Sequence, residues 1–252
     1  MKKHDKLVSI DLNADVGEGL PNDEALMPYI SSANICCGFH AGSRQIMQQT
    51  IGLCLQYYVS IGAHPGYPDR VNFGRKEQEL SPAQIMDLIG EQLMLMQEDC
   101  KAVGAIMCHI KPHGALYNQS ARNPQIAAAI AEALFCFNPQ LVLFGLSGSC
   151  SIAEAQKRGL RTASEVFADR TYTLDGSLTP REIFGALIKD TEKAVEQVRK
   201  IIEIQQVQTL SGHWIPMVAE TICLHGDGTH ALSFARKIHQ SITAGGIRIQ
   251  SV

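Results

Sequence analysis

The sequence predicts an α/β protein in which seven strands alternate with helices and close into a slightly irregular barrel. Seven short apolar runs alternate with stretches of helical periodicity, as in parallel β/α proteins. Nearly every run ends in a polar cluster with a titratable side chain, which is typical of barrels whose chemistry lies at one rim. A chain of 252 residues can form one barrel but is too short for two full α/β domains. We therefore expect a single domain over 1–252.

Strands are expected where apolar residues are continuous and are bounded by polar or turn-forming residues. An open doubly wound sheet is the alternative fold. Such a sheet binds its ligand where the strand order reverses, and it needs no titratable group after nearly every strand. The closed barrel therefore fits the pattern better. The expected strands lie at 7–12, 32–38, 59–63, 106–110, 141–146, 161–166 and 220–224.

Recognisable start signals open the helices between these strands. Ser81-Pro82-Ala83-Gln84 combines a cap residue, a proline at the first helical position and a glutamine at the third. Asn123-Pro124 opens a second helix, and Thr179-Pro180-Arg181-Glu182 repeats the signal and predicts a long helix through Ile202. We expect Asp227 or Thr229 to cap the last helix.

Three segments have no clear place among these elements. The connections 64–81 and 168–181 are unusually long, which makes them candidate lids or binding loops. The stretch 209–216 is either a strand extension or a third loop over the barrel mouth. The sequence does not distinguish between these two possibilities.

Composition excludes several classes of partner and site. The formal net charge is −3 without a block of basic residues, and no apolar run approaches the roughly 18 residues of a membrane span. We therefore expect neither nucleic acid nor a membrane as a partner. The 8 cysteines contain no CxxC pair, which argues against a zinc ribbon or a thioredoxin motif and favours a reducing cytoplasm.

Four histidines follow four different predicted strands: His40, His64, His113 and His225. Any one of them could be a packing or capping residue. A packing or capping role would have to apply to all four histidines independently. We therefore interpret the group as functional. His109 lies inside its strand and is expected to be structural.

Charged residues accompany the histidines at the strand ends. Asp15 and Glu18 follow the first strand, where they serve either the site or a turn. Lys111 precedes a proline, which holds its backbone extended, and its ammonium could stabilise a developing oxyanion. Glu165, Asp169 and Arg170 cluster around the end of the sixth strand. An internal salt bridge would explain Asp169 and Arg170, and it is compatible with a role of both residues in the site.

Metal and nucleotide sites are less clearly indicated. Asp15, His40 and His64 would form a reasonable N/O ligand set for a divalent metal, but no HExxH or similarly tight motif occurs. The turn at 145–150 contains glycines that could offer backbone N–H groups to an anion. No GxxxxGK[ST] motif occurs, so the chain lacks the recognisable P-loop for ATP.

The polar clusters resemble those of the LamB/YcsF family of lactam-utilisation proteins, in order and over nearly the whole chain. One departure is Ala14, where many relatives carry a cysteine, so this position is not expected to be a nucleophile here. The matching segments are DLNADVGEG at 11–19, SANICCGFHAG at 32–42, IGAHPGYPD at 61–69, FGR at 73–75, KPHGALYN at 111–118, EVFADRTY at 165–172, DGSL at 175–178 and CLHGD at 223–227.

The resemblance implies a seven-stranded β/α barrel similar to those of glycoside hydrolases and polysaccharide deacetylases. It also implies cleavage of 5-oxoproline to glutamate with ATP hydrolysis, as a component of a 5-oxoprolinase with partner subunits B and C. It assigns no individual roles. The residues that it implies for the pocket are Asp15, His40, His64, Lys111, His113, Glu165, Asp169, His225 and Asp227.

The leading interpretation is therefore a lactam-opening amidohydrolase component. Asp15 or Asp227 would act as base, a histidine as acid, and Lys111 as the partner of an oxyanion or a phosphate. The first alternative is a metal-dependent deacetylase or amidohydrolase that acts alone. The second is a non-catalytic subunit that binds the lactam and regulates a partner. The sequence leaves open the preferred lactam, the metal content and the oligomeric state, including a homo-oligomer.

Overall fold

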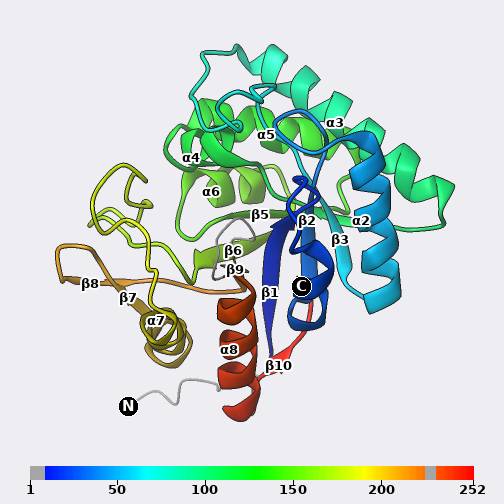
Figure 1. Ribbon diagram of the computed structural model, residues 1–252. Helices are drawn as coiled ribbons and strands as arrows, with labels where there is room; N and C mark the ends of the chain where they lie inside the picture. Colours follow the sequence, from blue (N-terminus) through cyan, green and yellow to red (C-terminus); the bar gives the residue numbers. More distant parts are fainter. Residues whose placement is uncertain (1–8, 225–230) are drawn as a thin grey trace.

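The computed structural model describes residues 9–224 and 231–252, in which seven parallel strands close into a barrel surrounded by helices (Figure 1). Neighbouring strands follow one another around the barrel, and the pairing of β9 with both β1 and β6 closes it. This confirms the predicted fold class. The barrel strands are β1 (Ser9–Val16), β2 (Ser32–Cys36), β3 (Ser60–His64), β4 (Met107–Ile110), β5 (Val142–Leu146), β6 (Arg161–Phe167) and β9 (Thr221–Leu224).

All seven predicted strands are present, but the first runs four residues further than expected. Residues Asn13-Ala14-Asp15-Val16 continue the strand predicted at 7–12 instead of leaving it in a polar turn. Side chains alternate along a strand, so Asp11, Asn13 and Asp15 share one face while the apolar residues between them face the helices. Their hydrogen-bond partners lie on other barrel strands, so this shared face points into the barrel.

The barrel interior contains an unusual number of polar side chains. Barrel interiors are more often filled by branched apolar residues. Here the Nδ2 group of Asn13 donates to Glu165 Oε1 at 2.9 Å and to Thr221 Oγ1 at 2.6 Å. Asn34 Nδ2 donates to Asn13 Oδ1 at 2.7 Å, and His109 Nε2 lies 2.9 Å from Asn34 Oδ1. Buried polar groups are stable only when they find such partners, so the strands must keep this register.

Helices cover the outside of the barrel, and two predicted start signals are confirmed. Ser81 and Gln84 form a capping box at the start of α3, and Asn123 caps α5. The helices are α1 (Asp23–Leu26), the 3-10 helix η1 (Met27–Tyr29), α2 (Arg44–Tyr57), α3 (Pro82–Ala102), α4 (Gly114–Arg122), α5 (Pro124–Phe137), α6 (Cys150–Lys157), α7 (Thr191–Ile204) and α8 (Ala231–Ala244). The residues proposed to cap α8, Asp227 and Thr229, lie outside the described residues.

The helix predicted from Thr179-Pro180 is wrong in its first half, because α7 (Thr191–Ile204) begins only at Thr191. Thr179 does not cap a helix, because its backbone N–H donates to Thr171 O and its hydroxyl accepts from the Thr171 hydroxyl. Gly185 then adopts a φ of +85°, a left-handed conformation that interrupts any helix. The helix begins only at α7, where the Asp190 carboxylate accepts from the N–H groups of Glu192 and Lys193.

The segment 209–216, which the sequence could not place, forms the turn and the second strand of an antiparallel hairpin beside the barrel (Figure 1). Its strands are β7 (Gln206–Gln208) and β8 (Trp214–Pro216), and the turn between them is closed by Thr209 N donating to His213 O at 2.8 Å. A short last strand, β10 (Arg248–Ile249), pairs with the first residues of β1.

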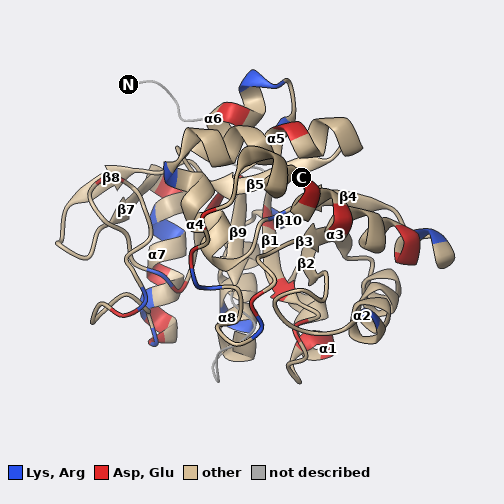
Figure 2. Cartoon of the chain, turned by 90° about the horizontal axis from the view of Figure 1, so that it is seen from above, with Lys and Arg blue, Asp and Glu red and all other residues tan. Residues whose placement is uncertain are grey.

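Neither the charged residues nor the apolar helices of the described chain form a dominant surface feature. Acidic and basic positions interleave over the helices and loops (Figure 2). Among the described helices, none combines the length and the apolar content needed to cross a membrane.

The buried carboxyl of Asp11 generates a prediction about stability. It accepts from Ser31 Oγ at 2.6 Å and from Ser32 Oγ at 2.7 Å, yet burial raises its pKa to about 6. The folded protein therefore binds a proton more tightly than the unfolded chain, and this stabilisation is lost as the pH rises through 6. We expect Asp11→Asn to gain about 2 kcal/mol relative to wild type between pH 4.5 and 7.5.

Urea denaturation of both proteins at the two pH values measures this difference. Asp87→Asn, on the exposed face of α3, is the matched control and should keep a constant offset from wild type. A constant offset for Asp11→Asn as well would contradict the prediction.

Candidate functional site

The barrel rim brings together most of the residues that the sequence singled out. Asp15 is near the end of β1, His64 ends β3, and Lys111 directly follows β4. His40 lies in the loop after β2, and His113 immediately precedes α4. All five side chains are buried. His225 and Asp227 lie outside the described residues.

Three histidines and one carboxylate form a compact cluster at this rim. Nδ1 of His113 lies 2.9 Å from Nε2 of His64. The rings of His40 and His113 stack with 3.8 Å between their centroids. Glu18 Oε1 lies 3.5 Å from His113 Nδ1 and 3.6 Å from His40 Nε2. One ligand atom from each of these four residues lies within 4.8 Å of the others, so the cluster has the composition and the size of a metal site.

The facing nitrogens of His64 and His113 have a defined chemical state. His64 Nδ1 is 2.7 Å from the carbonyl oxygen of Lys111, and His113 Nε2 is 2.9 Å from that of Phe73. A carbonyl oxygen only accepts, so both of these nitrogens carry the proton. In neutral rings the other nitrogens therefore present lone pairs to each other. Such an arrangement calls for a cation between them, either a proton or a metal ion.

Burial keeps two of these rings neutral. It lowers the pKa of His40 to about 3, with a further contribution from the nearby His64. Burial also lowers the pKa of His113 well below the ordinary histidine value, helped by His64 and His40. Neutral imidazoles are the form that binds metal ions.

The long connection after β3 packs over the cluster. Gly74, at a φ of +63°, approaches so closely that a Cβ there would lie 2.9 Å from the His40 Cβ. Tyr67 is fully buried, and its hydroxyl donates to Gln119 Oε1 at 2.7 Å. Gln92 pairs with both backbone groups of Gly66. The connection 64–81, interpreted from the sequence as a candidate lid or binding loop, thus packs closely over the site.

Lys111 forms a second centre next to the histidines. Its Nζ lies 2.9 Å from both Asp15 Oδ1 and Glu165 Oε1, and it donates to Cys223 Sγ at 3.0 Å. Burial alone would lower the lysine pKa, but the carboxylates of Asp15 and Glu165 outweigh it and hold the pKa of Lys111 well above its usual range. Lys111 is therefore a permanent cation.

Asp15 connects the two centres. Its Oδ1 accepts from Lys111 and, at 2.9 Å, from Asn34 Nδ2. Its Oδ2 lies 3.4 Å from His64 Nε2. His109 does not contact Asp15 directly but lies within hydrogen-bond distance of Asn34, which donates to Asp15. Its ring stacks on Phe144 with 4.2 Å between the ring centroids. This agrees with its expected structural role.

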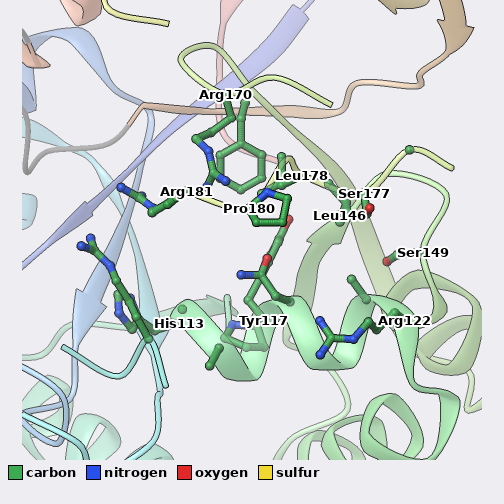
Figure 3. A pocket seen from close by; sticks show the side chains of 18 of the residues that line it. His113, Tyr117, Arg122, Leu146, Ser149, Arg170, Ser177, Leu178, Pro180 and Arg181 are labelled. Carbon is green, nitrogen blue, oxygen red and sulfur yellow. The ribbon is translucent and has the colours of Figure 1, made fainter. Parts of the chain in front are cut away.

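A cavity of about 920 Å³ opens beside both centres (Figure 3). The predicted site residues that line it are Asp15, Glu18, His64, Lys111 and His113. Glu165 is instead fully buried in the barrel. Asp169 is half-buried in the loop after β6. The glycine-containing turn at 145–150 also borders the cavity.

Sequence reasoning missed the basic lining of this cavity. Four arginines, Arg75, Arg122, Arg170 and Arg181, contribute to its walls. Arg75 belongs to a segment that carried the family resemblance, and Arg170 was interpreted as half of a salt bridge. Glu18 was noted as a turn residue or a site residue, and the structure brings it to the histidines.

Proteins of known sequence and structure resemble this chain over nearly its whole length. A protein from Clostridium kluyveri, which is named as the A subunit of 5-oxoprolinase, is 48% identical over 98% of this chain and 99% of its own. The crystal structure of a lactam utilization protein from Thermus thermophilus superposes with a TM-score of 0.91 at 36% identity, covering 97% of this chain and all of that one.

A more distant comparison concerns the fold alone. A peptidoglycan deacetylase from Bacillus subtilis has a TM-score of 0.50 at 10% identity, with coverage of 98% of this chain and 88% of that one. The model of the LamB/YcsF family matches residues 10–252. The match covers nearly the whole sequence, and the chain belongs to the LamB/YcsF family.

Proposed function

We propose that this chain opens the lactam ring of 5-oxoproline to give glutamate, as one component of an ATP-dependent enzyme in the cytoplasm. The observation that carries the proposal is the Asp15 carboxylate, fixed by Lys111 and Asn34 at the wall of the cavity and close to His64. The Clostridium kluyveri relative, whose name refers to 5-oxoprolinase, supports the choice of substrate. That name also describes one component of a larger enzyme, which supports the expectation of partner subunits; we identify these with B and C.

Opening the ring requires that water attack a planar, resonance-stabilised amide. In our proposal Asp15 takes a proton from water while the water oxygen bonds to the lactam carbon. The C–N bond then breaks, and the same carboxyl group returns the proton to the leaving nitrogen. We prefer Asp15 to a histidine as the acid, because His40 and His113 are neutral and a ring N–H of His113 is already donated to the Phe73 carbonyl.

Lys111 receives a positioning role in this proposal. An ammonium has three N–H donors, and Lys111 Nζ donates to Asn13 Oδ1 at 3.3 Å, to Asp15 Oδ1 and to Cys223 Sγ. The Glu165 carboxylate lies 2.9 Å away as a further counter-ion. No donor is left for the oxyanion that the sequence suggested as its partner. Instead, Lys111 orients Asp15 through the 2.9 Å contact between its Nζ and Asp15 Oδ1.

The histidine cluster fits a divalent metal with Glu18, His40, His64 and His113 as ligands. This set differs from the one proposed from the sequence, because Asp15 is engaged by Lys111 and is replaced by Glu18 and His113. A bound metal would supply Lewis-acid chemistry to a carbonyl or to a water molecule. The same cluster favours the alternative of a metal-dependent hydrolase that acts alone. The regulatory alternative requires lactam binding without turnover.

ATP is assigned to the partner subunits, because the sequence has no P-loop motif. The energy that activates the amide would then come from another chain.

The first prediction concerns the base. Asp15→Asn should lower lactam turnover by the partner-complemented enzyme by roughly 10²–10⁴-fold, the usual contribution of acid–base catalysis. The fold should survive, because Lys111 keeps Glu165 as its counter-ion. Glutamate release and circular dichroism measure the two effects, with Asp87→Asn as the surface control. Near-normal turnover by folded Asp15→Asn protein would remove Asp15 from the mechanism.

The second prediction concerns the metal. We expect purified wild-type protein to bind one Zn²⁺ or Mn²⁺ ion, and the loss of a ligand in His113→Ala to weaken binding at least about 10-fold. Isothermal titration after chelation measures the affinity, and elemental analysis measures the content. His239→Ala, a half-buried histidine of α8 outside the cluster, is the matched control and should bind normally. Equal affinities in His113→Ala and wild type would contradict the assignment.

The third prediction concerns the partners. The isolated chain should neither hydrolyse ATP nor open 5-oxoproline at a useful rate, whereas addition of subunits B and C should restore both activities together. Phosphate and glutamate release, measured with each component omitted in turn, test this. ATP hydrolysis stimulated by 5-oxoproline in the highly purified chain alone would make the protein a self-sufficient enzyme.

A further inference from the structure

Arg170 is a buried cation with little to balance it. Its side chain is 4% exposed and lies in the cavity wall, three residues beyond the end of β6. Nη2 donates to the carbonyl oxygen of Thr179 at 2.6 Å. Within residues 9–224 and 231–252, Nε has no hydrogen-bond acceptor. A guanidinium offers five N–H donors, so most of this group's hydrogen-bonding capacity is unused.

Burial and the nearby charge of Arg181 make the charged form of Arg170 energetically unfavourable when no ligand is bound. Burial lowers the arginine pKa to about 10, and the nearby positive charge of Arg181 contributes in the same direction, while Asp169 acts in the opposite one. The group still carries its charge at neutral pH. A buried charge without a close counter-ion is strongly unfavourable, and proteins keep such groups chiefly where a ligand completes them.

The backbone around Arg170 is held firmly in place. Gln197 Nε2 of α7 donates to the carbonyl oxygens of Phe167, Ala168 and Arg170 at 2.8, 3.3 and 2.9 Å. The Tyr172 hydroxyl accepts from Phe167 N at 2.7 Å. The guanidinium is therefore presented by a fixed scaffold, which is the condition for selective binding.

Arg170 shares the cavity with the reaction centre but lies on another wall. Figure 3 shows Arg170 and Arg181 on one side and His113 and Tyr117 of α4 on the other. The Phe167 ring also lines the cavity, and Lys111 Nζ lies 5.3 Å from its centroid. Arg170 and Arg181 thus lie across the cavity from His113 and Tyr117.

We propose that Arg170 binds the carboxylate of the substrate and so selects lactams that carry a carboxylate beside the ring nitrogen. The inference rests on the proposed function and adds a specificity residue to it. The planar guanidinium fork matches a carboxylate with two parallel hydrogen bonds. Anchoring the carboxylate on this wall leaves the amide of the ring to face Asp15. A phosphate group would use the same chemistry, and the test separates the two anions.

The experiment compares three probes on the purified chain: 5-oxoproline, inorganic phosphate and 2-pyrrolidinone, the same ring without a carboxylate. Wild type should bind 5-oxoproline more tightly than 2-pyrrolidinone. Arg170→Gln should weaken 5-oxoproline binding roughly 10- to 100-fold and leave 2-pyrrolidinone unchanged, so that the preference disappears. Arg170→Lys should restore the preference only in part, because an ammonium cannot form the fork.

Arg122→Gln is the matched control. It removes the same charge from the same cavity, but Arg122 already pairs with Glu77 at 2.6 Å and is largely exposed. It should keep the preference for 5-oxoproline. Thermal unfolding supplies a readout for folding: Arg170→Met, which removes the poorly balanced charge, should melt at or above the wild-type temperature without ligand.

Each outcome has a defined consequence. An unchanged preference in folded Arg170→Gln protein, or a strongly lowered melting temperature in Arg170→Met, overturns the role of Arg170 but leaves the proposed function standing. Phosphate binding that depends on Arg170, without a preference for 5-oxoproline, overturns the carboxylate assignment. Wild-type protein that binds neither lactam overturns the proposed function and this inference together.

Discussion

Lys111 brings a positive charge into a closed barrel, where water cannot stabilise it. The charge must be met by side chains from other strands, and Asp15 of β1 and Glu165 of β6 supply two carboxylates at 2.9 Å. Two anions around one cation leave an excess negative charge, which the donors of Asn13 and Asn34 help to satisfy. The polar interior of the barrel, the register of its strands and the orientation of the Asp15 carboxylate all follow from this requirement.

The site therefore places a centre of paired charges, around Lys111, next to a cluster of histidines. The Lys111 centre is charged and saturated with hydrogen bonds, so it can hold a carboxylate in one geometry. In the histidine cluster, burial keeps His40 and His113 neutral. Two backbone carbonyls fix the tautomers of His64 and His113, so that their other ring nitrogens face each other. Asp15 lies between them and borders the cavity. The Asp15 carboxylate thus contacts Lys111 through Oδ1 and lies close to His64 of the cluster through Oδ2.

Much of this could be predicted from the sequence because local signals agreed with the fold. Continuous apolar runs gave the seven strands, and the caps at Ser81 and Asn123 gave two helices. The histidines were found because they recur after strands. The Thr179-Pro180 signal failed because a cap depends on what the hydroxyl meets in the folded chain, and here it meets Thr171. The extension of β1 was hidden because strand residues that face a polar interior look like a loop. Tautomers and the unbalanced charge of Arg170 depend on contacts between distant segments, which no local pattern contains.

The ion pairs across the barrel also constrain how the protein reaches its folded state. Lys111 follows β4, while its counter-ions lie on β1 and β6, at opposite ends of the order in which the strands are made. A nascent chain that has formed only the first four strands lacks Glu165, and a fragment from β4 onward lacks Asp15. If either half excluded water from its centre, a charged group of the Lys111 centre would lack one of its partners. The barrel should therefore assemble late and cooperatively, and complementary halves made separately should stay open until they meet.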